Sequence, residues 1–303
     1  MVLAAVPAAP VLRAMGRGST VVAAQPNSKW AGVQVGLNVP YSFGTRTMSA
    51  DETLAKTLQL GISAVELRSQ PVELAMGAPL SVLQPARGAE AQKAPASALR
   101  EWRLKNSPGR GAGVRKSYED AGVNIDILKF DGIYDFSDPE MDYAFQLAKA
   151  VGARAISCEL DVAGSKRVGR FADKYMLMVG YHGHTKTTPA MFEEACGYAT
   201  HNGINLDIGH FVAGGLGSPI DFIKAHHDRI THIHIKDRKK NEGENVPYGT
   251  GDTPVKDVLQ LVRDNRWTGI QATIEYEMEV PEGSDRLTEI AKCVQYCKSA
   301  LLD

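Results

Sequence analysis

The chain has 303 residues, of which 44% are hydrophobic and 23% charged, so it can build a sizeable core. Its formal net charge is -1, which provides no global positive field for nucleic acid; only a local basic groove is compatible with it. The four cysteines lack the spacing of a structural zinc site or a disulfide framework. Cys293 and Cys297 lie one helical turn apart, and we expect them to be core and helix-face residues.

Residues 1–28 precede the first predicted element, and we expect this leader to lie outside the fold. The run VLAAVPAAPVLRA resembles the end of an export signal, yet no Lys or Arg precedes it. If it is the tail of such a signal, the protein is periplasmic; if it is a disordered leader, the protein is cytoplasmic. The run is too short and too interrupted by proline to span a bilayer, so no membrane partner is predicted.

Eight short segments rich in Val and Ile alternate with amphipathic helical patterns from residue 30 onward. The predicted strands are residues 33–39, 62–69, 123–130, 153–160, 175–182, 204–210, 230–237 and 270–277. The alternation predicts an α/β fold, a single (β/α)8 TIM barrel over residues 29–303. A doubly wound sheet is the alternative, but it would place a glycine-rich phosphate loop after the first strand, where the chain has VPYSFGTRT.

The predicted helices carry recognisable end signals. Residues 48–61 have Ser49 as N-cap and Glu52 placed for a capping box, and residues 138–152 repeat the arrangement with one apolar stripe. Residues 188–203 and 253–269 each open with Thr-Pro, a cap followed by proline at the first helical position.

Residues 70–115 interrupt this rhythm after the second strand. The segment is rich in Pro, Ala, Gly and basic residues. In a barrel such an insertion emerges at the catalytic face, where long loops serve as lids or contact partners. It is predicted to be a lid, a contact for a second copy or an accessory subunit, or else a surface excursion without function.

Carboxylates and imidazoles collect at the predicted strand ends of the second half, which also holds all eight histidines. In a barrel these ends form the face that carries active sites. A mixed set of oxygen and nitrogen donors without thiolates suits one divalent ion such as Mn²⁺, Mg²⁺, Co²⁺ or Zn²⁺. Taken singly, each of these carboxylates and imidazoles has a simpler explanation as a hydrogen-bonded or ion-paired side chain. The residues concerned are Glu159, His182, His184, Asp207, His210, His232, His234, Glu275 and Glu277.

Three segments make a family resemblance specific: NLDIGHF, HIHIKD and the closing IEYE. Together they resemble the sugar phosphate isomerase/epimerase group of the xylose isomerase-like TIM barrels, which includes ketose 3-epimerases, inosose isomerases and dehydratases, and 3-keto-glycoside deglycosidases. The resemblance runs from about Trp30 to Leu302 and is strongest over 150–280. It implies a small sugar, keto-sugar or inosose substrate, one divalent ion with Mn²⁺ favoured, and Asp207, His234 and Glu275 as ligands.

The fifth strand departs from this pattern. The epimerases usually end it in Glu-Asn-His, whereas this chain has His182-Gly183-His184. A subset of the group has histidines there together with a glutamate closing the fourth strand, so Glu159, His182 or both are predicted to complete the metal shell. A mechanism with two opposed glutamates is in doubt, and elimination from a 3-keto sugar or inosose gains weight.

The remaining candidates are assigned by chemistry. His184 is the first choice of base, because its unperturbed pKa is near the working pH. Lys236 either stabilises an oxyanion or pairs with Asp237, and Glu275 is both a ligand and a catalytic candidate. Substrate contacts are expected from His210, Arg68 and Arg238; His232 is expected one layer deeper, as support.

Two other classes of protein share features with this pattern. An apurinic endonuclease would draw further metal ligands from the early strands, which offer only Glu66 and Asp126 and no histidine. A non-catalytic sugar-binding barrel is the second. Arg238, Lys239 and Lys240 can supply charge to a phosphate, but such a run is also typical of a solvated loop.

Overall fold

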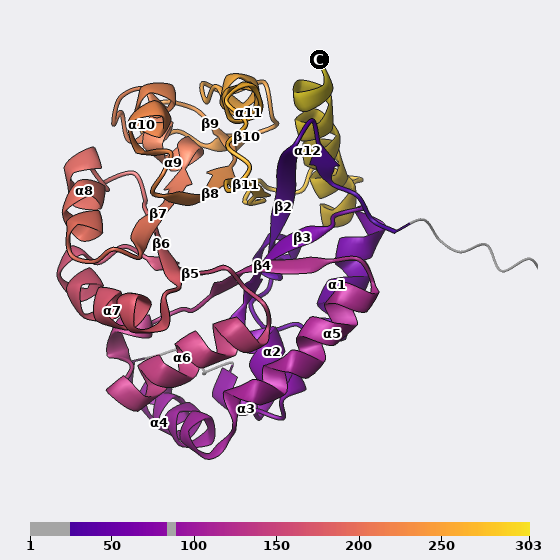
Figure 1. Cartoon of the computed structure of the whole chain (residues 1–303). Helices are drawn as coiled ribbons and strands as arrows, with labels where there is room; N and C mark the ends of the chain where they lie inside the picture. Colours follow the sequence, from indigo (N-terminus) through magenta and orange to yellow (C-terminus); the bar gives the residue numbers. More distant parts are fainter. Residues whose placement is uncertain (1–24, 84–88) are drawn as a thin grey trace, which may run out of the picture.

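The computed structural model describes residues 25–83 and 89–303, and the part of the predicted leader before residue 25 lies outside them. Eight parallel strands close a barrel, because β11 pairs with β2 and β2 with β3, which confirms the predicted TIM barrel (Figure 1). In order around the barrel they are β2 (Val33–Val39), β3 (Ala64–Arg68), β4 (Asn124–Lys129), β5 (Ala155–Glu159), β6 (Met178–His182), β7 (Asn202–Asp207), β8 (Ile230–Ile235) and β11 (Gln271–Ile274).

Several predicted strand boundaries are wrong by up to three residues, among them the end of the strand predicted at 270–277, which stops at Ile274. Two of these errors have a local reason. The strand expected at 175–182 begins only at Met178, because helix α7 runs to Tyr175 and Met176 ends it in a left-handed conformation with φ 49°. The strand expected at 204–210 ends at Asp207, whose carboxylate caps the following helix. The sequence did not predict three short strands. Strand β1 (Lys29–Trp30) pairs with β2, and β9 (Asp237–Arg238) pairs with β10 (Asn245–Val246).

Helices surround the barrel (Figure 1). Those that connect one barrel strand to the next or close the chain are α1 (Ala50–Gln59), α5 (Ala112–Asp120), α6 (Asp138–Ala150), α7 (Val162–Tyr175), α8 (Pro189–Gly197), α10 (Pro219–His226), α11 (Val255–Asp264) and α12 (Arg286–Leu302). Shorter elements at the strand ends are η1 (Tyr41–Phe43), η3 (Ile133–Asp135) and α9 (Ile208–Ala213). Within residues 25–83 and 89–303, none of the helices has the length and apolar character that crossing a membrane requires.

The helix ends follow the predicted capping chemistry only in part: Glu52 does not complete a capping box, the Thr188 side chain forms no cap bond, and α8 ends at Gly197 and not at residue 203. The Ser49 side chain accepts a hydrogen bond from the Glu52 amide, and α6 opens with a full capping box between Ser137 and Glu140. Helix α8 begins at Pro189 after Thr188, as expected. Helix α11 begins at Val255 with Pro254 as its N-cap, so the predicted start at Thr-Pro is wrong by one residue.

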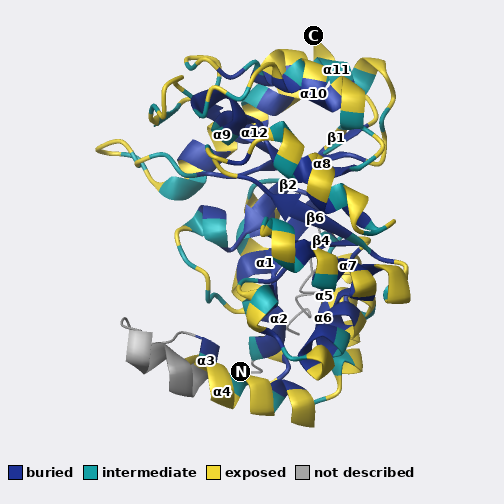
Figure 2. Cartoon of the chain, turned by 90° about the vertical axis from the view of Figure 1, so that its left-hand side faces the viewer, coloured by how far each residue is buried: buried dark blue, intermediate teal, exposed yellow. Residues whose placement is uncertain are grey.

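The core lies between the outward faces of the strands and the inward faces of the helices. Figure 2 shows the strands buried and the outer helix faces exposed. Cys158, Cys293 and Cys297 are buried and Cys196 is half-buried, and all four are free thiols, as their spacing predicts.

The insertion is helical where it is described: α2 (Ser69–Ala75), α3 (Leu80–Leu83), α4 (Ala89–Lys105) and η2 (Pro108–Gly111). Helix α4 is tied to its neighbours by charge. Arg103 Nε lies 2.7 Å from Glu73 Oε1, and Arg100 Nε lies 2.7 Å from Glu140 Oε2 on α6. These contacts anchor the segment to the barrel wall, while its use as a lid or a partner contact stays a prediction.

Candidate metal centre

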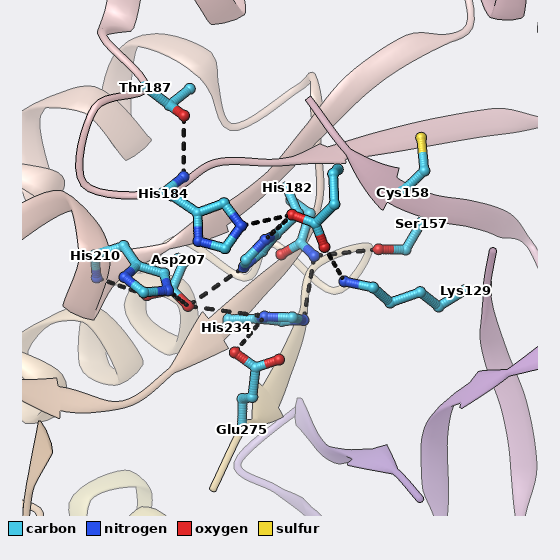
Figure 3. A network of polar contacts seen from close by, with 12 residues as sticks. Lys129, Ser157, Cys158, His182, His184, Thr187, Asp207, His210, His234 and Glu275 are labelled. Carbon is cyan, nitrogen blue, oxygen red and sulfur yellow. Dashed lines mark hydrogen bonds and ion pairs between the residues drawn. The ribbon is translucent and has the colours of Figure 1, made fainter. Parts of the chain in front are cut away.

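Four side chains from consecutive strand ends converge at the mouth of the barrel. His182, Asp207, His234 and Glu275 each offer one ligand atom, and these atoms lie within 4.8 Å of one another. The strand register explains the meeting, because Asp207 is paired with His234 across β7 and β8, and Glu275 directly follows β11. All four are at most 3% exposed, and Figure 3 shows Asp207, His182 and Glu275 around the His234 ring.

The orientation of the His234 imidazole is set by Glu66. His234 Nε2 lies 2.5 Å from Glu66 Oε2, so this nitrogen donates its proton to the carboxylate. Nδ1 has no hydrogen-bond partner and lies 3.3 Å from Glu275 Oε2 and 3.8 Å from Asp207 Oδ2. Burial works against charge on His234, but Glu66 and Glu275 raise its pKa to about 10. A buried, unpartnered imidazole nitrogen facing two carboxylates is the arrangement a divalent ion would satisfy.

His182 is held in a similar way by Glu159. His182 Nδ1 lies 2.9 Å from Glu159 Oε2, which leaves Nε2 facing Asp207 Oδ2 at 3.4 Å. Glu159 also contacts His184 Nε2 at 2.7 Å and Lys129 Nζ at 2.8 Å. Burial alone would raise the pKa of Glu159, but the hydrogen bonds from both histidines hold it well below its usual range. The structure therefore places His182 within the group of four and Glu159 behind it.

Each carboxylate of the group has one oxygen tied down and one directed at the site. Asn38 Nδ2 donates to Glu275 Oε1 at 2.7 Å, and the His210 amide donates to Asp207 Oδ1 at 2.7 Å. Burial would raise the pKa of both carboxyls, but the charge of Lys236 lowers them, so both are ionised. Two anionic oxygens and two imidazole nitrogens form a donor set that fits a hard or borderline divalent ion.

Lys236 lies beside the same oxygens. Its Nζ is 2.9 Å from Asp207 Oδ2, 2.5 Å from Glu275 Oε2 and 2.6 Å from Glu277 Oε2. With an ion on Asp207 and Glu275, Glu277 would still balance the ammonium charge. The alternative pairing with Asp237 is wrong, because that carboxylate accepts hydrogen bonds from the amides of residues 249, 251 and 253. A Cβ on Gly209 would lie 2.3 Å from Lys236 Cγ, so the glycine of the D-x-G-H motif makes room for this lysine.

The family model described as "Xylose isomerase-like TIM barrel" matches residues 140–298, slightly more than half of the chain and the whole group of four. The chain belongs to this family. No curated protein sequence matches it.

Solved structures of xylose isomerase-like barrels share the fold over most of their length. A probable 3-DHS dehydratase from Bacillus anthracis has 15% identity and a TM-score of 0.61, with 87% of this chain and 99% of that chain covered. An L-ribulose 3-epimerase has 12% identity and a TM-score of 0.59, covering 89% and 95%. A protein from Parabacteroides distasonis has 23% identity and a TM-score of 0.58, covering 88% and 99%. At these identities the likeness establishes the fold alone.

The other histidines of this xylose isomerase-like barrel differ in exposure. The His184 side chain is 58% exposed, and its hydrogen bond to Glu159 raises its pKa. His232 is fully buried, with Nδ1 2.8 Å from Thr231 Oγ1 and Nε2 3.5 Å from Glu66 Oε2, and burial lowers its pKa to about 4. His184 is thus open to a substrate, and His232 lies beneath the group of four.

The predicted substrate-binding residues already have protein partners. Arg238 Nη1 donates to His210 Nδ1 at 2.7 Å and also contacts the Gly243 carbonyl. Burial lowers the pKa of His210 to about 4, so it is neutral near pH 7 and its Nε2–H is a donor. Arg68 is 3% exposed, pairs with Asp131 at 2.5 Å and lies 4.8 Å from the centre of the Tyr41 ring. Arg238 therefore supports His210, and Arg68 supports the wall of the site.

Several polar residues that hold this centre were not singled out from the sequence as parts of it. The sequence pattern indicates Glu66 only as a ligand of the alternative nuclease site, and it predicts no role for Asn38, Lys129 and Asn205. Each sits in an apolar strand on the alternate positions that point into the barrel, as Glu159, His182 and His234 do. A polar residue at an inward position of a strand is the signal that would have found them.

Proposed function

We propose that this protein is a divalent-metal-dependent carbohydrate enzyme. It would remove a proton from the substrate carbon next to a carbonyl. The substrate would then be isomerised or epimerised, or it would lose a leaving group by elimination. The convergence of His182, Asp207, His234 and Glu275, with His234 Nδ1 left unpartnered, is the observation that carries the proposal. The family supports it, because it includes sugar epimerases, isomerases and dehydratases, and the structural neighbours include proteins named as an epimerase and a dehydratase.

The metal would be held by the group of four, with Mn²⁺ favoured over Mg²⁺, Co²⁺ and Zn²⁺ because carboxylates carry the charge and thiolates are absent from the group. Such an ion polarises a substrate carbonyl and makes the neighbouring C–H more acidic. Lys236 Nζ, which contacts the Asp207 and Glu275 oxygens proposed to hold the ion, adds a second positive charge at the site. This charge would stabilise the negative charge that grows on the substrate oxygen as the proton leaves.

His184 is the proposed base. Its Nε2 hydrogen bond to Glu159 would stabilise the imidazolium formed when Nδ1 accepts the substrate proton. The same bond raises the pKa of His184, and only the neutral imidazole can act as base. His210, neutral and held by Arg238, would donate its Nε2–H to a substrate hydroxyl.

Elimination from a 3-keto glycoside is the reaction we favour. The base His184 takes the proton from C2, and the C–H electrons form the C2–C3 enediolate. The C3 carbonyl then re-forms, a C1–C2 double bond forms as the bond from C1 to the aglycone oxygen breaks, and the aglycone leaves with the proton that His184 carries. This route needs one base and one proton donor, whereas epimerisation by two opposed glutamates lacks the second glutamate where the chain has His182-Gly183-His184.

The test is incubation of Mn²⁺-loaded protein with 3-keto glucosides, inososes and free ketoses, each with and without a carboxylate or phosphate substituent, in deuterated water, followed by NMR. Loss of aglycone indicates elimination, and deuterium at the carbon next to the carbonyl with a new sugar indicates isomerisation or epimerisation. Asp207→Asn is the matched control, because asparagine can still cap α9 while removing an anionic ligand. No exchange and no product with any substrate class would overturn the proposal.

A further inference from the structure

A cavity of about 590 Å³ opens beside the candidate metal centre. We call it the arginine cavity; its lining includes Tyr41, Arg46, Asn245, Glu277 and Arg286. Glu277 joins it to the metal centre, because Glu277 Oε2 lies 2.6 Å from Lys236 Nζ, which in turn contacts Asp207 and Glu275. The cavity therefore borders the Glu277–Lys236 pair that lies beside the metal centre.

Apart from Glu277, the charged side chains that line the cavity are the two arginines. Both Glu277 oxygens are engaged, one by Lys236 and the other by the Tyr41 hydroxyl at 2.7 Å. Within the described chain, neither Arg46 nor Arg286 forms an ion pair with a carboxylate. Instead the Arg46 guanidinium lies 6.0 Å from the Tyr41 ring centre, and that of Arg286 lies 5.1 Å from the centre of Tyr276. Two uncompensated guanidinium groups thus face one hollow.

Asn245 supplies an independent sign that a ligand is expected. Its Oδ1 is buried and has no hydrogen-bond partner in the structure. A buried acceptor without a donor costs stability, so Asn245 has a hydrogen bond to gain from a ligand hydroxyl that reaches it. The cavity also has the size of a small-molecule site, and its walls offer tyrosine rings on which a sugar ring can pack.

We propose that the arginine cavity binds an anionic substituent, a carboxylate or a phosphate, carried by the sugar or cyclic polyol whose carbonyl reacts at the metal centre. This inference rests on the proposed function and narrows its substrate class. Arginine binds both groups through paired N–H donors, and Asn245 would accept a hydrogen bond from a hydroxyl of the same molecule. A neutral sugar would leave both guanidinium groups unpaired, so the cavity would discriminate against it.

The experiment uses full-length protein freed of metal by chelator, so that an anion cannot bind through the ion. D-Glucuronate, glucose 6-phosphate and D-glucose are titrated separately by calorimetry. We expect one or both anionic sugars to bind at least about tenfold more tightly than glucose, and the stronger of the two identifies the carboxylate or the phosphate as the ligand group. Equal affinities for all three sugars would overturn the inference.

Two variants locate the binding. The double variant Arg46→Gln/Arg286→Gln should lose the preference for the anionic sugar, whereas Arg170→Gln, an exposed arginine on α7, should keep it. Circular dichroism and Mn²⁺ binding check that the double variant is folded with its metal centre intact. Unchanged anion affinity in the folded double variant would refute the site. Because this assay contains no metal, failure of Mn²⁺ binding refutes the proposed function separately.

Discussion

The two halves of the barrel contribute to the candidate centre in different ways. Strands β6, β7, β8 and β11 end in the residues whose ligand atoms converge, whereas β2, β3 and β4 supply Asn38, Glu66 and Lys129, which hold those residues in place. The candidate ligands come from the last two positions of β6, β7 and β8 and from the residue after β11. Lys129 likewise closes β4, whereas Asn38 and Glu66 lie one and two residues before the ends of β2 and β3, and all three supports are buried. The second half of the chain thus provides the candidate metal ligands, and side chains from the first half hold these ligands in position.

The largest effect is expected from a ligand in the second half. Asp207→Asn should abolish binding of one Mn²⁺ per chain, because it removes an anionic oxygen that faces His182 and His234. The helix cap is kept by asparagine, so the melting temperature without metal should change little. Metal analysis after gel filtration measures the loss, and full retention of Mn²⁺ would remove Asp207 as a ligand.

The next largest effect is expected at the exposed histidine. His184→Gln should lower turnover by about 10² to 10⁴-fold, the usual contribution of an acid–base group, with Mn²⁺ affinity unchanged. Steady-state kinetics and a metal titration of the same preparation separate the two properties. If turnover survives, His184 is not the base.

A smaller effect on affinity is expected from a support in the first half. Glu66→Gln keeps the shape of the side chain but removes the charge beside His234 Nε2, and loss of such a partner typically weakens metal binding about 10 to 100-fold. The apparent Kd for Mn²⁺ measures it. Asp126→Asn, on the neighbouring strand β4 and paired with Arg154, is the control that should leave the Kd unchanged. An equal Kd for Mn²⁺ in both variants would show that Glu66 does not support metal binding through His234.

The smallest step is expected from a change of one pH unit. In the metal-free protein Glu66 and Glu275 raise the pKa of His234 to about 10, so Nδ1 holds a proton at neutral pH that a metal must displace. Mn²⁺ affinity should therefore rise by about tenfold per pH unit between pH 6 and 8 from this residue. Calorimetry in buffers of different ionisation enthalpy counts the released protons, and a flat profile would show that Nδ1 is not the binding atom.

The fold was accessible from the sequence because its signals are local. Alternating apolar strands and capped helices predict the barrel. Some boundaries failed where a cap decided them, as Asp207 does by opening α9 instead of extending β7, and the strand predicted at 270–277 ends at Ile274 without such a cap. The insertion was harder to predict, since its Pro- and Ala-rich composition resembles a loop, whereas ion pairs of Arg100 and Arg103 with distant carboxylates fix it as helices.

The sequence alone predicts which residues stand at the strand ends, since the motifs D-I-G-H, H-I-H and I-E-Y-E are contiguous along the chain. The separate positions of these residues in the centre are visible only in the folded chain. His182 enters the group of four while Glu159 stands behind it, and Glu66, 168 residues before His234, fixes which nitrogen of that imidazole is free. Closing the barrel brings β3 and β8 side chains to its axis, and no spacing along the chain encodes a contact made across it.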